Sequence, residues 1–274
     1  MPRIFDIFTF FDEIDVLECR LHELADHVDC FVIVEGDRTH QGEKRDLVFK
    51  ENWSRFSRYA KKINYEPVIL PENPSSKSDD SAFPSGANWE RFRIQQNYGL
   101  LSYILGGSGE IEDDNTIGAS DDDIVFFGDV DEIPRREMTL LRPEKDEIIG
   151  LGMRHHIFSL GWLYPEQWVG TGVCRYKTAK EKTLHRIRVG RPGIKVIEDA
   201  GWHLSWFGGA DACRRKIDSF THPELADMKP AMEWCIKHGI AYDGRKMMRV
   251  RYDPDNPSVY PHYIQCGDMK GHWI

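Results

Sequence analysis

The clearest chemical pattern in the sequence is a pair of aspartates, Asp129 and Asp131, that follows the apolar run 124–127. In an extended segment, residues two apart point to the same side, so both carboxylates can face one point while Val130 turns back into the core. Carboxylate oxygens suit a hard divalent cation such as Mg²⁺ or Mn²⁺, which often completes its shell with substrate phosphates. The pair therefore predicts a metal site that binds a phosphorylated ligand.

A bare Asp-x-Asp pair also arises by chance, and three acids after a strand can simply keep a loop in solution. The surrounding residues favour a function. Gly128 comes directly before the pair, and the pair is followed by a third acid, Glu132, and by Pro134, which ends the strand. We therefore interpret the motif as a ligand site at the carboxyl end of a central strand.

The segments around the motif predict an alternation of strands and helices. Strands are predicted at 4–10, 29–35, 65–70, 124–127, 147–153 and 201–206, helices at 14–28, 51–62, 89–105 and 211–221, and polar connections at 71–88 and 106–123. This alternation is typical of an α/β fold with a Rossmann-like, mostly parallel sheet flanked by helices. In such sheets ligands bind outside the carboxyl ends of the strands, where the aspartate pair is predicted to lie.

Composition narrows the class of protein. The 274 residues are 41% hydrophobic and 30% charged, which fits a globular chain that forms one domain. The net charge of −9 argues against nucleic acid as a partner. The sequence predicts neither a signal peptide nor a transmembrane segment, which leaves peripheral contact as the only membrane role. Six cysteines without CxxC spacing predict reduced thiols and a cytoplasmic protein.

Several separated blocks resemble glycosyltransferase family 17, the β-1,4-mannosyl-glycoprotein 4-β-N-acetylglucosaminyltransferase family. The resemblance covers residues 4–222 and is carried by 5–13 (FDIFTFFDE), 17–21 (LECRL), 31–35 (FVIVE) with 38–40 (RTH), 122–134 and 201–209 (GWHLSWFGG). It implies a GT-A-like fold, a UDP-sugar donor (UDP-GlcNAc in the best-known members), a carbohydrate acceptor and inversion at the anomeric carbon. The chain departs from the animal members in lacking an N-terminal anchor and stem, so we expect a surface-polysaccharide, lipid-linked or small-glycoside acceptor.

The resemblance divides the chain into a nucleotide-binding half (1–135), an acceptor-side half (136–252) and an irregular tail (253–274). Asp131 is then expected to bind the metal directly, and Asp129 directly or through ribose and water. His203 is the candidate third ligand, although it could equally be satisfied by backbone in a tryptophan-rich core.

Residues near the predicted strand ends and on the predicted helices 89–105 and 211–221 are candidates for contacts with the nucleotide sugar. They are Thr9, Phe10, Glu35, Arg38, Arg93, Asn97, Asp129, Arg214 and Arg215. Core packing remains the alternative for Phe10, and a solvated helix surface remains the alternative for Arg93 and Asn97. A solvated face is at least as good an interpretation of the neighbouring Lys216.

An inverting transfer needs one general base to deprotonate the acceptor hydroxyl, and Asp199, Glu198 and Asp211 are the candidates.

Two other functions also fit parts of the sequence. A Mg²⁺-dependent phosphatase of the haloacid-dehalogenase type has a similar Asp-x-Asp pair, but on an early strand and followed by Gly-Thr. A non-catalytic carbohydrate-binding protein would fit the 12% aromatic content, but that function would not explain the acidic residues at 129–132.

Overall fold

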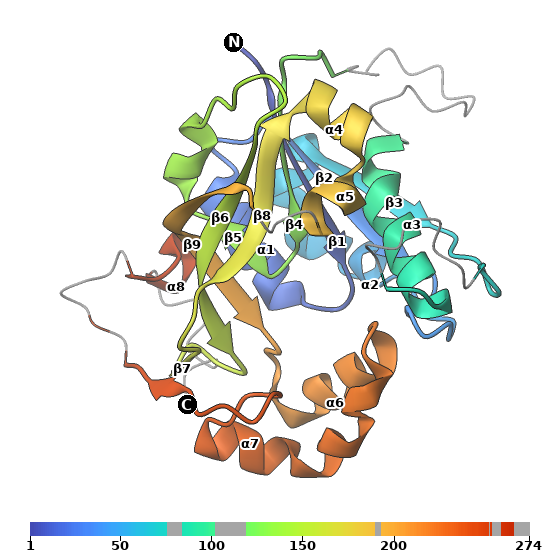
Figure 1. Cartoon of the computed structure of the whole chain (residues 1–274), viewed down its shortest axis with the longest axis vertical. Helices are drawn as coiled ribbons and strands as arrows, with labels where there is room; N and C mark the ends of the chain where they lie inside the picture. The colour runs from blue at the N-terminus through green and yellow to red at the C-terminus, as the bar shows by residue number, and fades with distance from the viewer. Residues whose placement is uncertain (76–83, 102–118, 190–192, 252, 254–258, 266–274) are drawn as a thin grey trace.

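The computed structural model describes residues 1–75, 84–101, 119–189, 193–251, 253 and 259–265. Residues 76–83 of the first predicted polar connection and 106–118 of the second therefore lie outside the described residues. The described strands form one mixed sheet at the centre of the molecule (Figure 1). These strands are β1 (Ile4–Phe10), β2 (Cys30–Gly36), β3 (Ile63–Val68), β4 (Ile124–Asp129), β5 (Glu132–Pro134), β6 (Ile148–Ile157), β7 (Trp162–Leu163), β8 (Trp168–Arg175), β9 (Lys195–Ser205) and β10 (Met248–Arg249).

Strands β3, β2, β1 and β4 lie side by side in that order, and every pairing among them is parallel. The predicted α/β alternation of the first half is confirmed. Since β2 and β3 extend the sheet on one side of β1 and β4 extends it on the other, the chain changes direction between β1 and β4. Such a switch point leaves a crevice at the carboxyl ends of the two strands.

The rest of the sheet is mixed. Strand β8 runs antiparallel to both β4 and β6, whereas β6 and β9 are parallel. The short strands β5, β7 and β10 pair only in antiparallel fashion. The sequence did not predict β8, because Gly170 and Gly172 weaken its strand pattern.

Helices cover both faces of the sheet. The helices are α1 (Ile14–Leu24), α2 (Val48–Glu51), α3 (Ala87–Leu101), α4 (Tyr176–Lys182), α5 (Leu184–Val189), α6 (Gly209–Ser219), α7 (Met232–His238) and α8 (His262–Gln265), with 3₁₀ segments η1 (Trp53–Lys62), η2 (Arg136–Leu140) and η3 (Pro223–Ala231). The predicted helix at 51–62 is therefore mostly 3₁₀.

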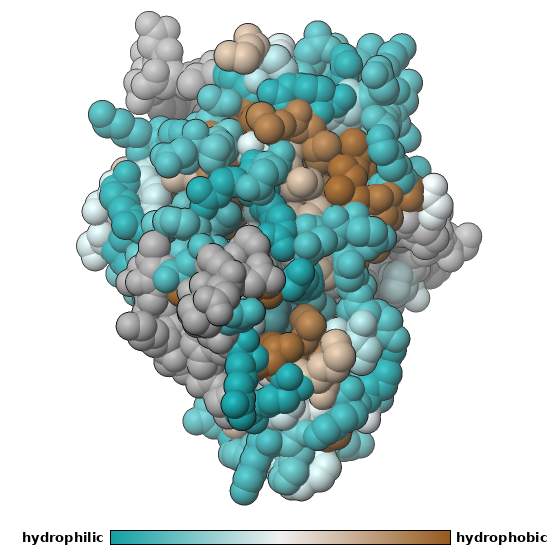
Figure 2. All heavy atoms as spheres, turned by 90° about the vertical axis from the view of Figure 1, so that its left-hand side faces the viewer, coloured by the Kyte–Doolittle hydropathy of each residue, from teal (hydrophilic) through white to brown (hydrophobic). Residues whose placement is uncertain are grey.

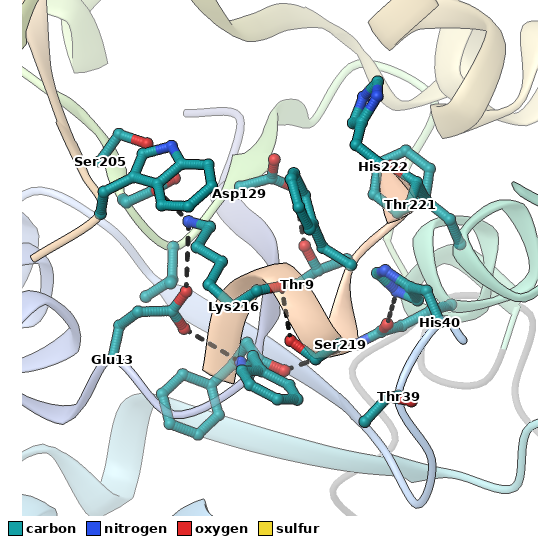
Figure 3. Close-up of a pocket in the computed structure, with 18 of the residues that line it drawn as sticks. Thr9, Glu13, Thr39, His40, Asp129, Ser205, Lys216, Ser219, Thr221 and His222 are labelled. Carbon is teal, nitrogen blue, oxygen red and sulfur yellow. Dashed lines mark hydrogen bonds and ion pairs between the residues drawn. The ribbon is translucent and has the colours of Figure 1, made fainter. Parts of the chain in front are cut away.

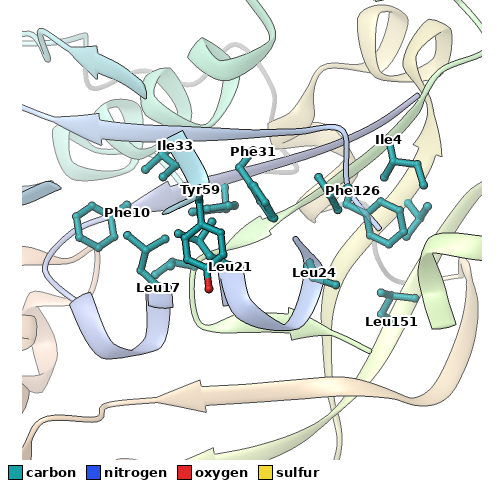
Figure 4. Packing of buried hydrophobic residues seen from close by; sticks show 14 of the residues in the cluster. Ile4, Phe10, Leu17, Leu21, Leu24, Phe31, Ile33, Tyr59, Phe126 and Leu151 are labelled. Atoms are coloured by element: carbon teal, nitrogen blue, oxygen red, sulfur yellow. The ribbon is translucent and has the colours of Figure 1, made fainter. Parts of the chain in front are cut away.

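The alternation of side chains in β1 builds two cores. Phe8 and Phe10 pack with α1, α2 and η1 on one face, which Figure 4 shows from close by. Phe5 and Ile7 point to the other face, where α3, α4 and α5 pack. Strand β1 is thus buried on both sides and holds its carboxyl end rigidly beneath the crevice.

Helices α6 and α7 and segment η3 form a group beyond the ends of β6 and β9 (Figure 1). The tail was predicted to be irregular, but its described part includes the short helix α8. Tyr263 and Ile264 of α8 pack with Val16 and Cys19 of α1, and this apolar contact explains why the segment is ordered against the fold.

The surface in Figure 2 is mostly hydrophilic, with hydrophobic residues gathered in limited areas. None of the described helices combines the length and the apolar character that a bilayer span requires.

Candidate active site

A pocket of about 660 Å³ opens at the carboxyl ends of β1, β2 and β4. Its walls also include residues of α3, α5, α6, β6 and β9, so both predicted halves of the chain contribute (Figure 3). The pocket therefore occupies the crevice expected at the switch point between β1 and β4. Both Asp129 and Asp131 line it.

Asp129 lies at the end of β4, directly across from Thr9 of β1. The Thr9 hydroxyl donates a hydrogen bond of 2.7 Å to Asp129 Oδ1. Arg188 of α5 pairs with Asp129 and places its Nη1 2.9 Å from Glu132 Oε2. Burial raises the pKa of Asp129 against the opposing effect of the Arg188 charge.

Asp131 lies at the floor of the pocket and faces two nitrogen groups. His203 Nε2 of β9 is 3.5 Å from Oδ1, and Lys216 Nζ of α6 is 3.3 Å from Oδ2. Although burial opposes ionisation, Lys216 and His203 hold the pKa of the Asp131 carboxyl well below its usual range. Asp131 is therefore an anion whose two partners come from β9 and α6.

Arg20 of α1 fixes the turn that carries both aspartates. Its fully buried guanidinium donates to both oxygens of Asp6, at 2.8 and 2.6 Å. The remaining nitrogen, Nη1, donates to the backbone oxygens of Asp129 (2.9 Å) and Glu132 (2.7 Å). The bidentate pair with Asp6 holds the Arg20 guanidinium in one orientation. Its Nη1 is therefore a fixed donor that constrains the backbone of residues 129–132.

Glu132 has a supporting role that the sequence did not reveal. Its side chain is fully buried and accepts hydrogen bonds from the indole of Trp168 (2.6 Å) and from the backbone N–H of Asp129 (3.1 Å). Together with the ion pair to Arg188, these contacts allow Glu132 to hold the backbone of Asp129 in position.

The atoms at Asp131 that could bind a metal are of the kinds that a divalent cation accepts as ligands. The rings of His203 and His155 stack with centroids 4.4 Å apart, which orients His203 Nε2 toward the carboxylate. Carboxylate oxygen and imidazole nitrogen are ligands that Mn²⁺ accepts. Among the described residues no group of three His, Cys, Asp or Glu side chains forms a complete metal site, so phosphate oxygens would have to supply further ligands.

Three of the predicted nucleotide contacts besides Asp129 line the pocket, namely Thr9, Phe10 and Arg38. Phe10 is only 2% exposed and packs edge-on against Phe49, so most of its surface belongs to the core. Glu35 does not line the pocket. It is fully buried and accepts hydrogen bonds from the first backbone N–H groups of α2, which is a structural role.

The predicted contacts on the helices also lie elsewhere. Arg93 pairs with Glu90 on the exposed side of α3, and the Asn97 side chain accepts a hydrogen bond from the backbone N–H of His185. Arg214 and Arg215 point away from the pocket on α6, while Lys216 points into it. The interpretation of Lys216 as a solvated residue was therefore wrong, because its helix turns this one cation inward.

None of the three predicted general bases lines the pocket. Asp199 forms ion pairs with Arg135 and Arg154, and Glu198 is exposed on the same stretch of β9. Asp211 is 86% exposed at the start of α6 and pairs with Arg214. Sequence proximity to β9 and α6 did not indicate on which side of those elements the carboxylates lie.

Other pocket residues were missed because no local motif marks them. Glu13 follows β1, Arg188 belongs to a short helix without a recognisable pattern, and His155 lies on strand β6. The clustering of histidine, tryptophan and charged residues after apolar strands was the only available signal.

With this geometry established, comparison with known proteins defines the class as a glycosyltransferase. The chain belongs to glycosyltransferase family 17, whose model matches residues 1–232. This membership favours a transferase over the phosphatase and the binding protein considered from the sequence.

Two relatives are named β-1,4-mannosyl-glycoprotein 4-β-N-acetylglucosaminyltransferase. The human protein is 23% identical over 99% of this chain and 55% of its own length, and the rat protein is 23% identical over 96% and 52%. The chain thus spans about half the length of these relatives. The glycosyltransferase GlyE of Streptococcus pneumoniae TIGR4 is a structural match with 13% identity, covering 68% of this chain and 37% of GlyE, and its TM-score of 0.29 supports no conclusion about fold.

Proposed function

We propose that the protein is a metal-dependent, inverting glycosyltransferase of GT-A-like fold that moves GlcNAc from UDP-GlcNAc to a hydroxyl of a glycan or glycoside. The observation that carries this proposal is the position of Asp129 and Asp131 in the pocket at the β1/β4 switch point of a family 17 chain. Nucleotides bind at such points in α/β sheets.

Asp131 and His203 would hold Mn²⁺ or Mg²⁺, with Asp129 bound directly or through ribose and water. The cation, when bound, supplies positive charge to the diphosphate that departs from the sugar. Arg188 and Lys216 add two fixed cations at the same place, since each already pairs with one aspartate. Their charges would become available to phosphate oxygens when the metal neutralises the carboxylates.

The nucleoside is assigned to the part of the pocket beside the ends of β1 and β2. Thr9, Phe10, Phe11 and Arg38 line that part, and the Arg45 guanidinium lies 4.3 Å from the centre of the Phe11 ring. Aromatic and cationic groups of this kind suit a flat base joined to phosphates. The acceptor is assigned to the part of the pocket that Trp206 and Tyr242 line, where Lys216 Nζ lies 5.8 Å from the centre of the Trp206 ring.

The proposal is tested by incubating the protein with Mn²⁺ and a panel of UDP- and GDP-sugars and measuring nucleotide release. We expect release of UDP from UDP-GlcNAc, and loss of that release in Asp131→Ala. The matched control is Asp211→Ala, which removes an exposed aspartate outside the pocket and should leave the rate unchanged.

Calorimetry gives an independent check. UDP should bind more tightly in the presence of Mn²⁺ than with EDTA, and Asp131→Ala should abolish the difference. The absence of any metal-assisted nucleotide binding to the wild-type protein would refute the proposed metal dependence. Release of phosphate from a phosphomonoester without nucleotide release would instead point to a phosphatase.

A further inference from the structure

The pocket lining includes five carboxylate side chains among the described residues: Glu13, Asp129, Asp131, Glu224 and Asp243. Four of them are either assigned to the metal or paired with other side chains. The two aspartates of the motif are assigned to the metal. Glu224 is 65% exposed and pairs with His222, and Asp243 accepts hydrogen bonds from Tyr164 and Arg245. Glu13 is the remaining carboxylate.

Glu13 lies between the end of β1 and the start of α1. Its Oε2 accepts hydrogen bonds from the backbone N–H groups of Phe11 (3.2 Å) and Asp12 (3.1 Å), which fixes the side chain. Its Oε1 faces Lys216 Nζ at 3.8 Å, as the dashed contact in Figure 3 shows. The carboxylate is thus oriented by the backbone, and one oxygen is directed into the pocket.

Lys216 connects Glu13 to the metal motif. The same ammonium group lies 3.3 Å from Asp131 and 3.8 Å from Glu13, so a single side chain separates the two carboxylates. If a diphosphate is held at Asp131 and Lys216, the sugar that it carries would lie next to the ammonium group that Glu13 also faces, and its anomeric carbon is the atom that the acceptor attacks. An acceptor hydroxyl that approaches this carbon needs a base on that side.

We propose that Glu13 is the general base of the transfer, an inference that rests on the transferase function proposed above. The Glu13 carboxylate takes the proton of the acceptor hydroxyl, and the hydroxyl oxygen forms the new bond to the anomeric carbon. The bond from that carbon to the diphosphate oxygen breaks, and its electron pair leaves with the nucleoside diphosphate. No other reactant is required.

The environment of Glu13 suits this role. Burial raises the pKa of Glu13 to about 7, against the opposing effect of Lys216 and with smaller contributions from Asp12 and Asp131. A general base works best when its pKa lies near the operating pH, because it is then both ionised and a strong enough proton acceptor.

The test compares Glu13→Gln with Asp211→Asn in UDP release from UDP-GlcNAc and Mn²⁺, with methyl pyranosides as acceptors. Glutamine keeps an oxygen that can accept the N–H groups of Phe11 and Asp12, so the fold is preserved while the base is lost. We expect the turnover rate of Glu13→Gln to fall at least about 100-fold, with the affinity for UDP-GlcNAc and Mn²⁺ by calorimetry within about two-fold of wild type. Asp211→Asn removes an equal charge from an exposed side chain outside the pocket and should stay within about two-fold in both measurements.

A Glu13→Gln protein that keeps more than a tenth of the wild-type rate would overturn the assignment. A parallel loss of donor affinity would also overturn it, because Glu13 would then serve binding. If Glu13→Gln does not fold, Glu13→Asp takes its place. Withdrawing the base by one methylene must lower the rate at least ten-fold, and an unchanged rate refutes the role. A wild-type protein that releases no nucleotide from any donor would refute the transferase itself, whereas an active Glu13→Gln refutes only the base.

Discussion

The hydroxyl of Thr9 donates to Asp129 Oδ1 over 2.7 Å and so ties the carboxyl end of β1 to that of β4. These two strands flank the point at which the parallel sheet changes direction. The hydrogen bond therefore fixes one acid of the motif to a strand that is buried along its whole length, and the orientation of Asp129 depends on a residue 120 positions away in sequence.

Thr9→Val tests this link, because valine has nearly the same shape and no hydroxyl. We expect the free energy of unfolding to fall by about 1 to 3 kcal/mol, since the bond is made to a charged group. Affinity for UDP with Mn²⁺ should weaken as Asp129 loses its orientation. Denaturant unfolding and calorimetry measure the two effects, and Thr9→Ser, which keeps the hydroxyl, should lie closer to wild type in both.

Arg20 offers a way to separate stability from the geometry of the site. Arg20→Met leaves the carboxylate of Asp6 buried without its partner and should cost about 3 to 5 kcal/mol in unfolding free energy. Adding Asp6→Leu removes the stranded charge and should restore most of that stability.

The double variant still lacks the Arg20 Nη1 donor to the backbone oxygens of Asp129 and Glu132. We therefore expect it to melt near the wild-type temperature and yet to bind UDP with Mn²⁺ more weakly. Wild-type binding in a stable double variant would show that Arg20 does not position the motif.

Lys216→Met should strengthen the binding of Mn²⁺ to the nucleotide-free protein. Lys216 is a cation 3.3 Å from Asp131, so it opposes a metal ion at that carboxylate. Loss of about 1.4 kcal/mol of repulsion would raise the affinity roughly ten-fold. Calorimetric titration with Mn²⁺ measures the change, and Lys216→Arg, which retains the charge, is the matched control. Weaker metal binding in Lys216→Met would contradict competition between the two cations.

Buried histidines predict a pH effect on stability. Burial lowers the pKa of His156 to about 4, and that of His40 and His185 likewise to about 4. The unfolded chain binds a proton at these side chains below about pH 6.5 and the folded chain does not. The stability that each neutral ring contributes is therefore fully present above pH 6.5 and is lost as the pH falls toward 4.

His156→Gln isolates one such group. The difference in unfolding free energy between wild type and variant should shrink by about 1.4 kcal/mol for each pH unit below 6.5. Denaturant unfolding at pH 7, 6 and 5 measures it. A difference that stays constant over this range would mean that His156 takes up its proton equally in both states.

The sequence by itself determined the elements that carry the motif. The strands predicted at 4–10, 29–35 and 124–127 and a helix starting at residue 14 were found, although that helix ends at Leu24 and not at residue 28, because alternation and three- to four-residue spacing are properties of adjacent residues. The paired spacing of Asp129 and Asp131 also predicted the edge of the sheet at which the pocket lies, since the carboxyl ends of parallel strands share one edge.

Only the tertiary structure decided which side chains surround that motif. Glu13, Arg188 and Lys216 converge on the pocket from three different elements, whereas the predicted bases Asp199 and Asp211 form ion pairs elsewhere. Local spacing defines the period of a helix or strand but not the direction in which a polar side chain faces when both sides are partly exposed. That direction is set by contacts between elements distant in sequence, and these contacts bring Lys216 to Asp131 and leave its neighbours Arg214 and Arg215 outside.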